Sequence, residues 1–354
     1  MSKFISRLSE RIGTSGTAKK ALAESKRLCA EGRHQEAITR LTETYRATGN
    51  SAVVRELVLV RNDAVLNGTF TSPIVEWPPS VPDLFPGCAG IPEISRDQLT
   101  AAALAAGIVH HGGLIVRGLL TPDMVTKFER HVRAAFDADE LHEAGKATDE
   151  SLKWFSPFEG RGASQEVLGR EFVRKGGGVL GADSPATMHD VLQMAEDAGV
   201  IKAIAEFLGE ERPAISVKKT TLRIVPPDTY TGWHQDGAFL GKDVRTVNMW
   251  ISLSECGEDA PSLDLIPHRF DEIVPTGVEG AAFDWSVSDT VAERYAGDRG
   301  IHHPNFAPGD AIFFDHMNLH RTGVRPGMTK ERLAIEWWFF APSHFPMDQI
   351  PLLA

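Results

Sequence analysis

The segment TGWHQDGAF (231–239) places a histidine and an aspartate two positions apart, directly after a stretch rich in β-branched residues. Alternate residues of an extended chain project to the same side, so the imidazole of His234 and the carboxylate of Asp236 would point together. Two such groups can act as neighbouring ligands of a metal ion. The pair alone does not establish a metal site, because His-x-Asp also arises by chance and is compatible with a surface turn. A third ligand is required.

A candidate third ligand lies in DAIFFDHMNLHRTG (310–323), which contains two histidines. We favour His320, which follows a predicted strand that ends near Asp315. Two histidines and one carboxylate that leave open coordination positions are the ligand set of non-haem Fe(II) oxygenases. His316 is the competing candidate, with a capping or turn role as its alternative. His320, unlike His316, keeps the spacing to a downstream threonine and arginine that could act with the metal.

Those downstream residues could anchor an acidic co-substrate. Arg332 stands twelve residues after His320 and opens the apolar segment RLAIEWWFF (332–340), while Thr322 lies two residues after the same histidine. A planar guanidinium together with a hydroxyl group suits the distal carboxylate of a molecule such as 2-oxoglutarate. The alternative for Arg332 is an ordinary surface arginine. The complete order of His-x-Asp, distant histidine and strand-opening arginine is far more specific than any one part.

Residues 95–345 resemble the phytanoyl-CoA dioxygenase family of Fe(II)/2-oxoglutarate-dependent oxygenases. The matching segments are WHQDGAF, VNMWISL, SLDLIP, PGDAIFFDHMNLHRTG and ERLAIEWWFF. The resemblance implies a double-stranded β-helix, a fold of the jelly-roll or cupin type, and the use of Fe(II), 2-oxoglutarate and O2. It also implies roles for seven residues: His234, Asp236 and His320 as iron ligands, Thr322 and Arg332 as contacts of the far carboxylate of 2-oxoglutarate, and Gln235 and Trp250 as neighbours of that co-substrate.

The resemblance predicts a dioxygenase that hydroxylates a small organic substrate and releases succinate and CO2. Related halogenases require a small residue in place of the ligand carboxylate, so Asp236 favours hydroxylation, or a desaturating or ring-forming variant. The family commonly continues Ile-Pro with Gly-Ser-His, whereas this chain has IPHRF and a displaced His268, which leaves the substrate contacts open. Two alternatives remain: a cupin-like metal enzyme that is not an oxygenase, and an inactive barrel serving as an interaction protein through its N-terminal helices.

The elements expected around these residues form a mainly β domain with supporting helices. Strands are predicted from runs rich in β-branched and aromatic residues, separated by turn sequences such as PPDTYTG and APGD. These runs are GLIVRG (113–118), TTLRIV (220–225), TVNMWISL (246–253), LDLIP (263–267), AIFFD (311–315) and LAIEWWFF (333–340). Helices are predicted over 97–107, over 121–136 with Thr121 as N-cap, and over two segments between 185 and 208. This order favours an antiparallel jelly roll.

The composition divides the chain into a helical region (1–68), a proline-rich linker (69–95) and a dioxygenase domain (96–354). Apolar residues at helical spacing predict helices between 18 and 65, with breaks at Gly32 and Gly49. The run CAEGRHQEAITRLTETYRATGN resembles one tetratricopeptide unit. One unit is too short to bury a continuous core, so we prefer a small helical appendage, packed on the main domain or on a second subunit, over a peptide-binding array.

Charge and cysteine content narrow the expected partners and location. A net charge of −11 argues against a nucleic-acid-binding protein, which normally presents a basic face. Cys29, Cys88 and Cys256 fit neither a disulfide framework nor a zinc motif, which favours a reducing cytoplasm. No apolar run approaches membrane-spanning length, although the mildly basic N-terminus leaves an organellar presequence as an alternative. The expected partner is a small-molecule substrate, with no nucleic acid and no membrane, and self-association through the N-terminal helices is a further hypothesis.

Overall fold

The computed structural model describes residues 2–74, 76–161, 168–229 and 231–354, with side chains described from residue 16 onward. The strands are β1 Glu93–Ser95, β2 Leu114–Arg117, β3 Gly178–Leu180, β4 Ala214–Ser216, β5 Thr221–Val225, β6 Thr246–Ser252, β7 Ser262–Arg269, β8 Ala311–Phe314, β9 Asn318–Gly323, β10 Arg332–Phe340 and β11 Pro351–Leu353. The α-helices are α1 Ser2–Ala30, α2 His34–Thr48, α3 Ser51–Leu66, α4 Ala101–His111, α5 Pro122–Glu143, α7 Arg170–Lys175, α8 Pro185–Asp197, α9 Val200–Leu208, α10 Gly237–Leu240 and α11 Asp289–Ala296. Short 3-10 helices are η1 Arg96–Gln98, η2 Ser151–Lys153, η3 Gly181–Asp183, η4 Gly297–Arg299, η5 Pro342–His344 and η6 Met347–Gln349.

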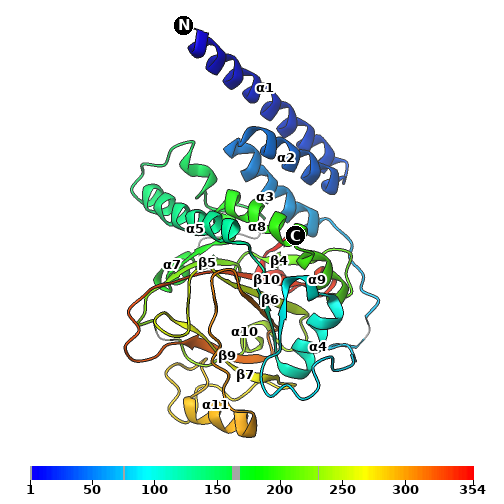
Figure 1. Cartoon of the computed structure of the whole chain (residues 1–354). Coiled ribbons are helices and arrows are strands. Elements are labelled where there is room, and N and C mark those ends of the chain that lie inside the picture. The colour runs from blue at the N-terminus through cyan, green and yellow to red at the C-terminus, as the bar shows by residue number, and fades with distance from the viewer. Residues whose placement is uncertain (1, 75, 162–167, 230) are drawn as a thin grey trace.

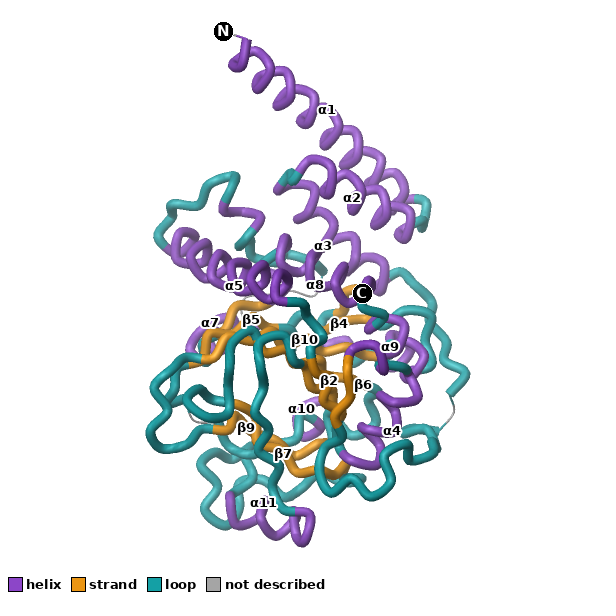
Figure 2. The backbone as a smooth tube through the Cα atoms, viewed as in Figure 1, coloured by secondary structure: helices purple, strands orange, loops and turns teal. Residues whose placement is uncertain are grey.

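The strands form the two sheets of a jelly roll (Figures 1 and 2). In the large sheet the order is β1-β2-β8-β6-β10-β4-β11, with β5 beside β10 and β3 beside β5. The small sheet contains the antiparallel pair β7-β9. Isolated bridges widen it on both sides, because His234 pairs with His320 of β9 and His302 pairs with Leu265 of β7. This is the double-stranded β-helix expected from the sequence.

Side-chain alternation along β10 separates two apolar regions. Trp337 and Phe339 pack on the outer side of the large sheet in one core with residues of α8 and α9. Trp338 and Phe340 point the other way and pack inside the barrel with residues of β6, β7 and β8. Because alternate residues of a strand share a face, Arg332 and Glu336 of β10 lie on the interior face with Trp338. The strand orientation that buries Trp337 and Phe339 in the outer core therefore also points Arg332 and Glu336 into the barrel.

The predicted elements are present with shifted ends, and the structure adds elements that the sequence did not indicate, among them the strands β1, β3, β4, β9 and β11. Thr121 caps α5 by accepting a hydrogen bond from the backbone N of Met124 at 3.4 Å. That helix continues seven residues past the predicted end at 136, to Glu143. Strand β9 was not predicted, since its sequence NLHRTG lacks an apolar run. Pairing with β7, rather than local propensity, holds β9 extended.

The N-terminal helices meet the barrel through α3. Figure 1 shows α1 projecting away from the body, with α3 lying between the first two helices and the β-strands. Leu57 and Val58 of α3 are buried. Beside them, Arg61 Nη1 donates to the carbonyl of Leu353 at 2.6 Å and Asn62 Nδ2 to that of Pro351 at 2.8 Å. A boundary at residue 68 would therefore separate α3 from contacts with β11.

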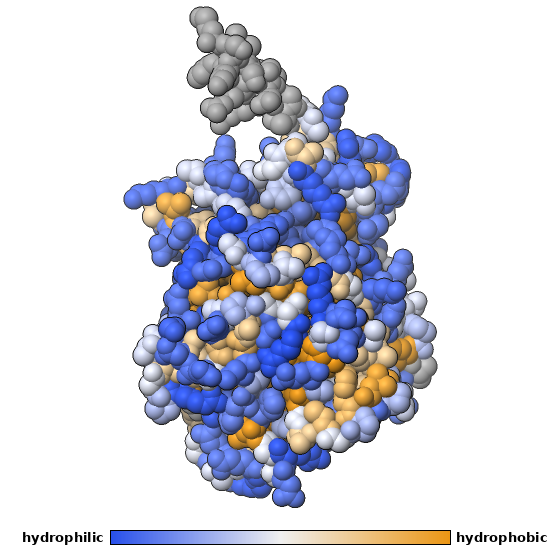
Figure 3. Space-filling view, in the orientation of Figure 1, coloured by the Kyte–Doolittle hydropathy of each residue, from blue (hydrophilic) through white to orange (hydrophobic). Residues whose placement is uncertain are grey.

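The surface differs between the helical layer and the barrel. On the face drawn in Figure 3 the helices are mainly hydrophilic, whereas apolar residues are visible over the barrel below them. Cys29, Cys88 and Cys256 are free thiols. Over the described ranges, none of the helices combines the length and the apolar character needed to cross a membrane.

Candidate metal and co-substrate site

Three side chains that could hold a metal ion converge at the small sheet. Among the described residues, His234, Asp236 and His320 form a group whose ligand atoms all lie within 4.8 Å of one another. Backbone hydrogen bonds fix the two histidines opposite each other, with N–O distances of 2.9 and 3.0 Å. Asp236 follows two residues later, where the chain turns into α10. His234 and His320, which are 86 positions apart in the sequence, thereby lie side by side.

The histidine rings are oriented by backbone carbonyls. Nδ1 of His234 lies 2.9 Å from the carbonyl oxygen of Gly232, and Nδ1 of His320 lies 3.2 Å from that of Asn318. When each Nδ1 carries the proton and donates it, Nε2 keeps its lone pair; Nε2 of His320 lies 3.6 Å from Asp236 Oδ2. Burial, reinforced by the neighbouring His234, lowers the pKa of His320 to about 4. The ring is therefore neutral near pH 7, as a metal ligand must be.

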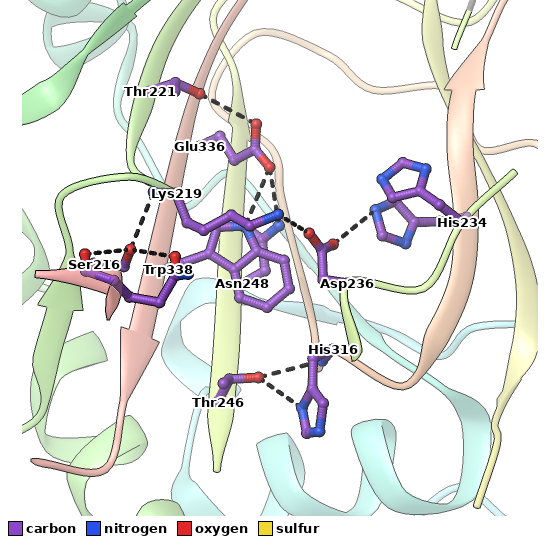
Figure 4. Close-up of polar contacts among 12 residues, drawn as sticks. Ser216, Lys219, Thr221, His234, Asp236, Thr246, Asn248, His316, Glu336 and Trp338 are labelled. Carbon is purple, nitrogen blue, oxygen red and sulfur yellow. Dashed lines mark hydrogen bonds and ion pairs between the residues drawn. The ribbon is translucent and has the colours of Figure 1, made fainter. Parts of the chain in front are cut away.

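The carboxylate of Asp236 is held ionised by a cation. Its side chain is 6% exposed and forms an ion pair with Lys219 Nζ (Figure 4). Burial by itself would raise the pKa of Asp236, but the charge of Lys219, with His234 and His320, holds it well below its ordinary value. An ionised carboxylate beside two imidazoles is a donor set that fits Fe(II).

Gly237 allows the segment that carries Asp236 to pack closely against Ile273 and Met317. Its backbone N donates to the carbonyl of His316 at 2.8 Å. A Cβ at this position would lie 2.8 Å from Ile273 Cδ1 and 2.9 Å from Met317 Sδ, closer than side chains tolerate. The glycine of HQDG thus permits the close approach that brings Asp236 beside the small sheet.

His316 lies apart from the group. Its Nδ1 is 2.9 Å from Thr246 Oγ1, and its Nε2 is 3.2 Å from the carbonyl oxygen of Lys242. Figure 4 shows His316 and Thr246 well separated from Asp236 and His234. Both ring nitrogens of His316 are engaged in holding the loop before β6 against the loop after β8. The side chain therefore has a structural role here.

Arg332 opens β10 and is buried inside the barrel. Its Nη1 donates to the carbonyl of Ser262 at 2.8 Å, and its guanidinium lies 5.4 Å from the ring centroid of Trp250. Burial lowers the pKa of Arg332 to about 10, so the group remains charged at neutral pH. Within the described residues its buried Nε has no hydrogen-bond partner. A buried, charged guanidinium with a free donor fits the carboxylate of a small acid.

Thr322 lies close to this arginine by strand register. Ser262, the partner of Arg332, pairs with Gly323 of β9, and the next residue of β7 pairs with Thr322. Thr322 and His320 are alternate residues of β9 and share one face. A co-substrate between the histidine and the arginine would pass this hydroxyl.

Gln235 is placed differently from the expectation that it neighbours the co-substrate. Its Nε2 donates to the carbonyl of Met317 at 2.9 Å, and its Oε1 accepts from the backbone N of Val274 at 2.7 Å. As the residue between His234 and Asp236, it points to the opposite side of the chain. Its polar atoms hold the loop after β7, and the expected contact with the co-substrate gains no support. Trp250, by contrast, lies directly against Arg332.

A second group of polar residues inside the barrel was not assigned to the site from the sequence. Glu336 accepts hydrogen bonds from Thr221 Oγ1 and Trp338 Nε1, both at 3.2 Å, and lies 3.5 Å from Arg223 Nη2. Although burial opposes its ionisation, Arg223 holds the pKa of Glu336 below its ordinary value. The available signal was the alternation of Lys219, Thr221 and Arg223, which places three polar groups on one side of an extended segment.

The sequence IPHRF (266–270), which differs from the usual pattern of the family, affects strand β7 and not the group of metal-ligand candidates. The pairing of β7 with β9 is irregular between Leu265 and Arg269. Arg269 then turns inward and forms a buried ion pair with Asp315, at 2.6 Å between Nε and Oδ2. The unusual turn is thus stabilised by a charge pair that ties β7 to the end of β8.

Comparison with known proteins defines the family. The sequence profile of the phytanoyl-CoA dioxygenase (PhyH) family matches residues 108–325, more than half of the chain. The chain therefore belongs to the phytanoyl-CoA dioxygenase family, whose enzymes are Fe(II)/2-oxoglutarate-dependent oxygenases. Its cofactor is Fe(II) and its co-substrates are 2-oxoglutarate and O2, as the sequence predicted. Arg332 lies beyond the matched range, so its role depends on the geometry above.

The chain is also similar, at low sequence identity, to several solved structures. EvdO2 from Micromonospora carbonacea var. aurantiaca, complexed with 2-oxoglutarate, is 16% identical over 69% of this chain and 89% of that chain, with a TM-score of 0.43. EctD from S. alaskensis, with 2-oxoglutarate and 5-hydroxyectoine, is 17% identical over 69% of this chain and 76% of that chain, with a TM-score of 0.43. SnoK, a non-heme alpha-ketoglutarate-dependent carbocyclase from nogalamycin biosynthesis, is 14% identical over 70% of this chain and 86% of that chain, with a TM-score of 0.44. No curated protein sequence matches the chain.

Proposed function

We propose that this protein is a hydroxylase of a small organic substrate, in which His234, Asp236 and His320 hold Fe(II). The observation that carries the proposal is the convergence of these three side chains within 4.8 Å, with each imidazole Nδ1 turned to a backbone carbonyl. The net reaction would be R–H + 2-oxoglutarate + O2 → R–OH + succinate + CO2. Bound Fe(II) supplies the redox chemistry that couples decarboxylation of 2-oxoglutarate to attack on the substrate C–H bond.

Arg332 and Thr322 would hold 2-oxoglutarate by its distal carboxylate. Support comes from the free buried Nε of Arg332 and from the register that places Thr322 next to its partner Ser262. The guanidinium also lies over the ring of Trp250, 5.4 Å from its centroid, and this cation–π contact would help to position the group that donates to the carboxylate. Because Arg332 is anchored to β7, the co-substrate would be held in one orientation relative to the metal group.

Asp236 favours hydroxylation over halogenation. Its carboxylate occupies the position that related halogenases leave to a halide, and Lys219 keeps it ionised. The low exposure of Asp236 and His320 also limits access of water to the metal group. Desaturation and ring closure use the same residues, and the product distinguishes them from hydroxylation.

The proposal is tested with purified protein under anaerobic conditions. Addition of Fe(II) and 2-oxoglutarate should produce the weak visible absorption band that 2-oxoglutarate gives when it chelates ferrous iron. On admission of air, succinate should form, and with a metabolite extract one product should gain the mass of one oxygen atom. A protein that binds iron but gives no band with 2-oxoglutarate would instead be a cupin-like enzyme of another class. A protein that binds neither would favour the interaction-protein alternative.

A further inference from the structure

The charged side chains described inside the barrel include more cations than anions. Contacts or close electrostatic interactions join five of them in the described residues, three cations and two anions: Lys219, Arg223, Arg332, Asp236 and Glu336. Lys219 pairs with Asp236, and Arg223 lies 3.5 Å from Glu336. Within the described residues Arg332 forms no salt bridge, although the approach of Glu336 supports its charge. The group therefore carries one excess positive charge.

Loading of the site leaves this excess in place. This step rests on the proposed function, in which Asp236 binds Fe(II) and Arg332 binds 2-oxoglutarate. The doubly positive metal and the doubly negative co-substrate cancel each other, so the sum of one positive charge is unchanged. Once Asp236 donates to a metal, Lys219 loses most of its attraction to that carboxylate. The ammonium of Lys219 is then the cation without an anion of its own.

Lys219 lies beside the metal group together with aromatic side chains. Its Nζ lies 5.1 Å from the ring centroid of Phe239, and its side chain is 26% exposed. Trp285 lies 5.9 Å from Phe239 and packs edge-on against His234 at 5.8 Å. Lys219 and these aromatic rings therefore surround the same metal ligands.

The aromatic rings form an exposed apolar surface beside the metal group. Phe283 stacks on Trp285 with centroids 5.0 Å apart and ring planes 2° apart. Phe239 is 48% exposed and Phe283 is 43% exposed. Large apolar side chains this exposed, next to a metal group and a cation, suit a ligand with an apolar body and an acidic end.

We propose that the substrate is an organic monocarboxylate that pairs with Lys219 and rests its ring-bearing apolar body on Phe239, Phe283 and Trp285. A neutral substrate would leave the excess charge uncompensated, and a cationic one would add to it. The C–H bond that reacts would lie between the carboxylate and the ring or on the ring itself.

The test compares matched acids and amides by binding rather than turnover. Anaerobic protein loaded with Fe(II) and 2-oxoglutarate is titrated with 3-phenylpropanoate, 3-phenylpropanamide, hexanoate and hexanamide, by calorimetry and by the perturbation of the chelate band. Wild type should bind each acid at least about tenfold more tightly than its amide, as a charge-assisted hydrogen bond predicts. Lys219→Met should reduce this preference to less than about threefold. Lys218→Met, whose nearest acidic group is Asp348 at 3.9 Å, should leave it unchanged.

The ring-binding surface is tested with Phe283→Ala, which removes an exposed ring away from the ligands. It should weaken 3-phenylpropanoate about threefold or more and leave hexanoate unchanged; equal effects on both would overturn the aromatic part of the proposal. Amides that bind as tightly as acids, or no saturable binding of either acid, would overturn the monocarboxylate. So would loss of 2-oxoglutarate affinity in Lys219→Met with the acid preference retained, since Lys219 would then serve the co-substrate. Absence of the chelate band in wild type would instead overturn the proposed function itself.

Discussion

The two sheets of the barrel contribute to the site in different ways. The small sheet carries short ligand side chains whose orientation is fixed by the main chain, through the His234–His320 bridge and the carbonyls of Gly232 and Asn318. The segment leading into β5 and strand β10 of the large sheet carry long charged side chains, such as Lys219 and Glu336, which are held by other side chains. Groups fixed by the backbone keep one geometry, whereas groups held by side chains can exchange partners when a ligand arrives. We therefore expect the proposed metal position to be rigid and the pairing of the charged side chains on the large sheet to change when a ligand binds.

The largest expected effect comes from the small sheet. His234→Ala and His320→Ala should each remove iron from the purified protein and abolish succinate formation, because the remaining two ligands cannot hold the metal. His316→Ala is the matched control, since its ring nitrogens bond to Thr246 and to the carbonyl of Lys242. Iron content and succinate are measured for all three. An inactive, folded His316→Ala beside an active His320→Ala would reassign the third ligand.

Arg332 should give the next largest effect. Removing one partner of a buried charge pair costs about 2–5 kcal/mol, so Arg332→Ala should weaken 2-oxoglutarate roughly 30-fold or more while the iron content stays the same. Arg332→Lys should be intermediate because it keeps the charge but loses the planar fork. The measurement is a 2-oxoglutarate titration of the chelate band, with Arg325→Ala as control. Equal affinities in wild type and both Arg332 variants would assign this arginine to a structural role.

A substitution of Glu336 tests whether the net charge on the large sheet controls the binding of an acid. Glu336→Gln keeps the size of the side chain and one of its two acceptor oxygens but removes one negative charge from the barrel. It should tighten binding of 3-phenylpropanoate roughly threefold, the opposite sign from Lys219→Met, because the excess positive charge rises. Glu331→Gln, which affects an exposed pair with Arg133, is the control. Weaker binding of the acid would contradict the charge argument.

A substitution in α3 should affect stability and leave the site unchanged. Leu57 is buried between the helices and the barrel, so Leu57→Ala should lower the free energy of unfolding by about 2–5 kcal/mol. The affinity of the folded protein for 2-oxoglutarate should not change, because every residue proposed to bind iron or 2-oxoglutarate lies after residue 230. Thermal denaturation and the chelate titration are compared with the exposed control Arg55→Ala. A weakened affinity would mean that the helical region shapes the site.

Prediction from the sequence worked where local pattern and local structure coincide. The strands with long apolar runs, such as β6 and β10, lie where the sequence indicated, since burial on both faces of a sheet requires such runs. Strand β9 was missed because its sequence NLHRTG lacks an apolar run, and its extended shape comes from pairing with β7. The sequence also gave no sign that the amide of Gln235 binds backbone groups of two separate loops, the carbonyl of Met317 between β8 and β9 and the N–H of Val274 after β7.

The sequence by itself determined the family and the kind of chemistry, and it supplied His234, Asp236 and His320 as candidate metal ligands, because residue types and their order along the chain can be read without the structure. It also selected His320 over His316 by spacing. Only the tertiary structure decided what surrounds that chemistry. The pairing of Lys219 with Asp236, the position of Glu336 beside Arg223 and the ring surface around Trp285 each join segments from different parts of the chain. Charge balance and shape depend on distances in space, and these distances are set by sheet register and loop packing rather than by sequence separation.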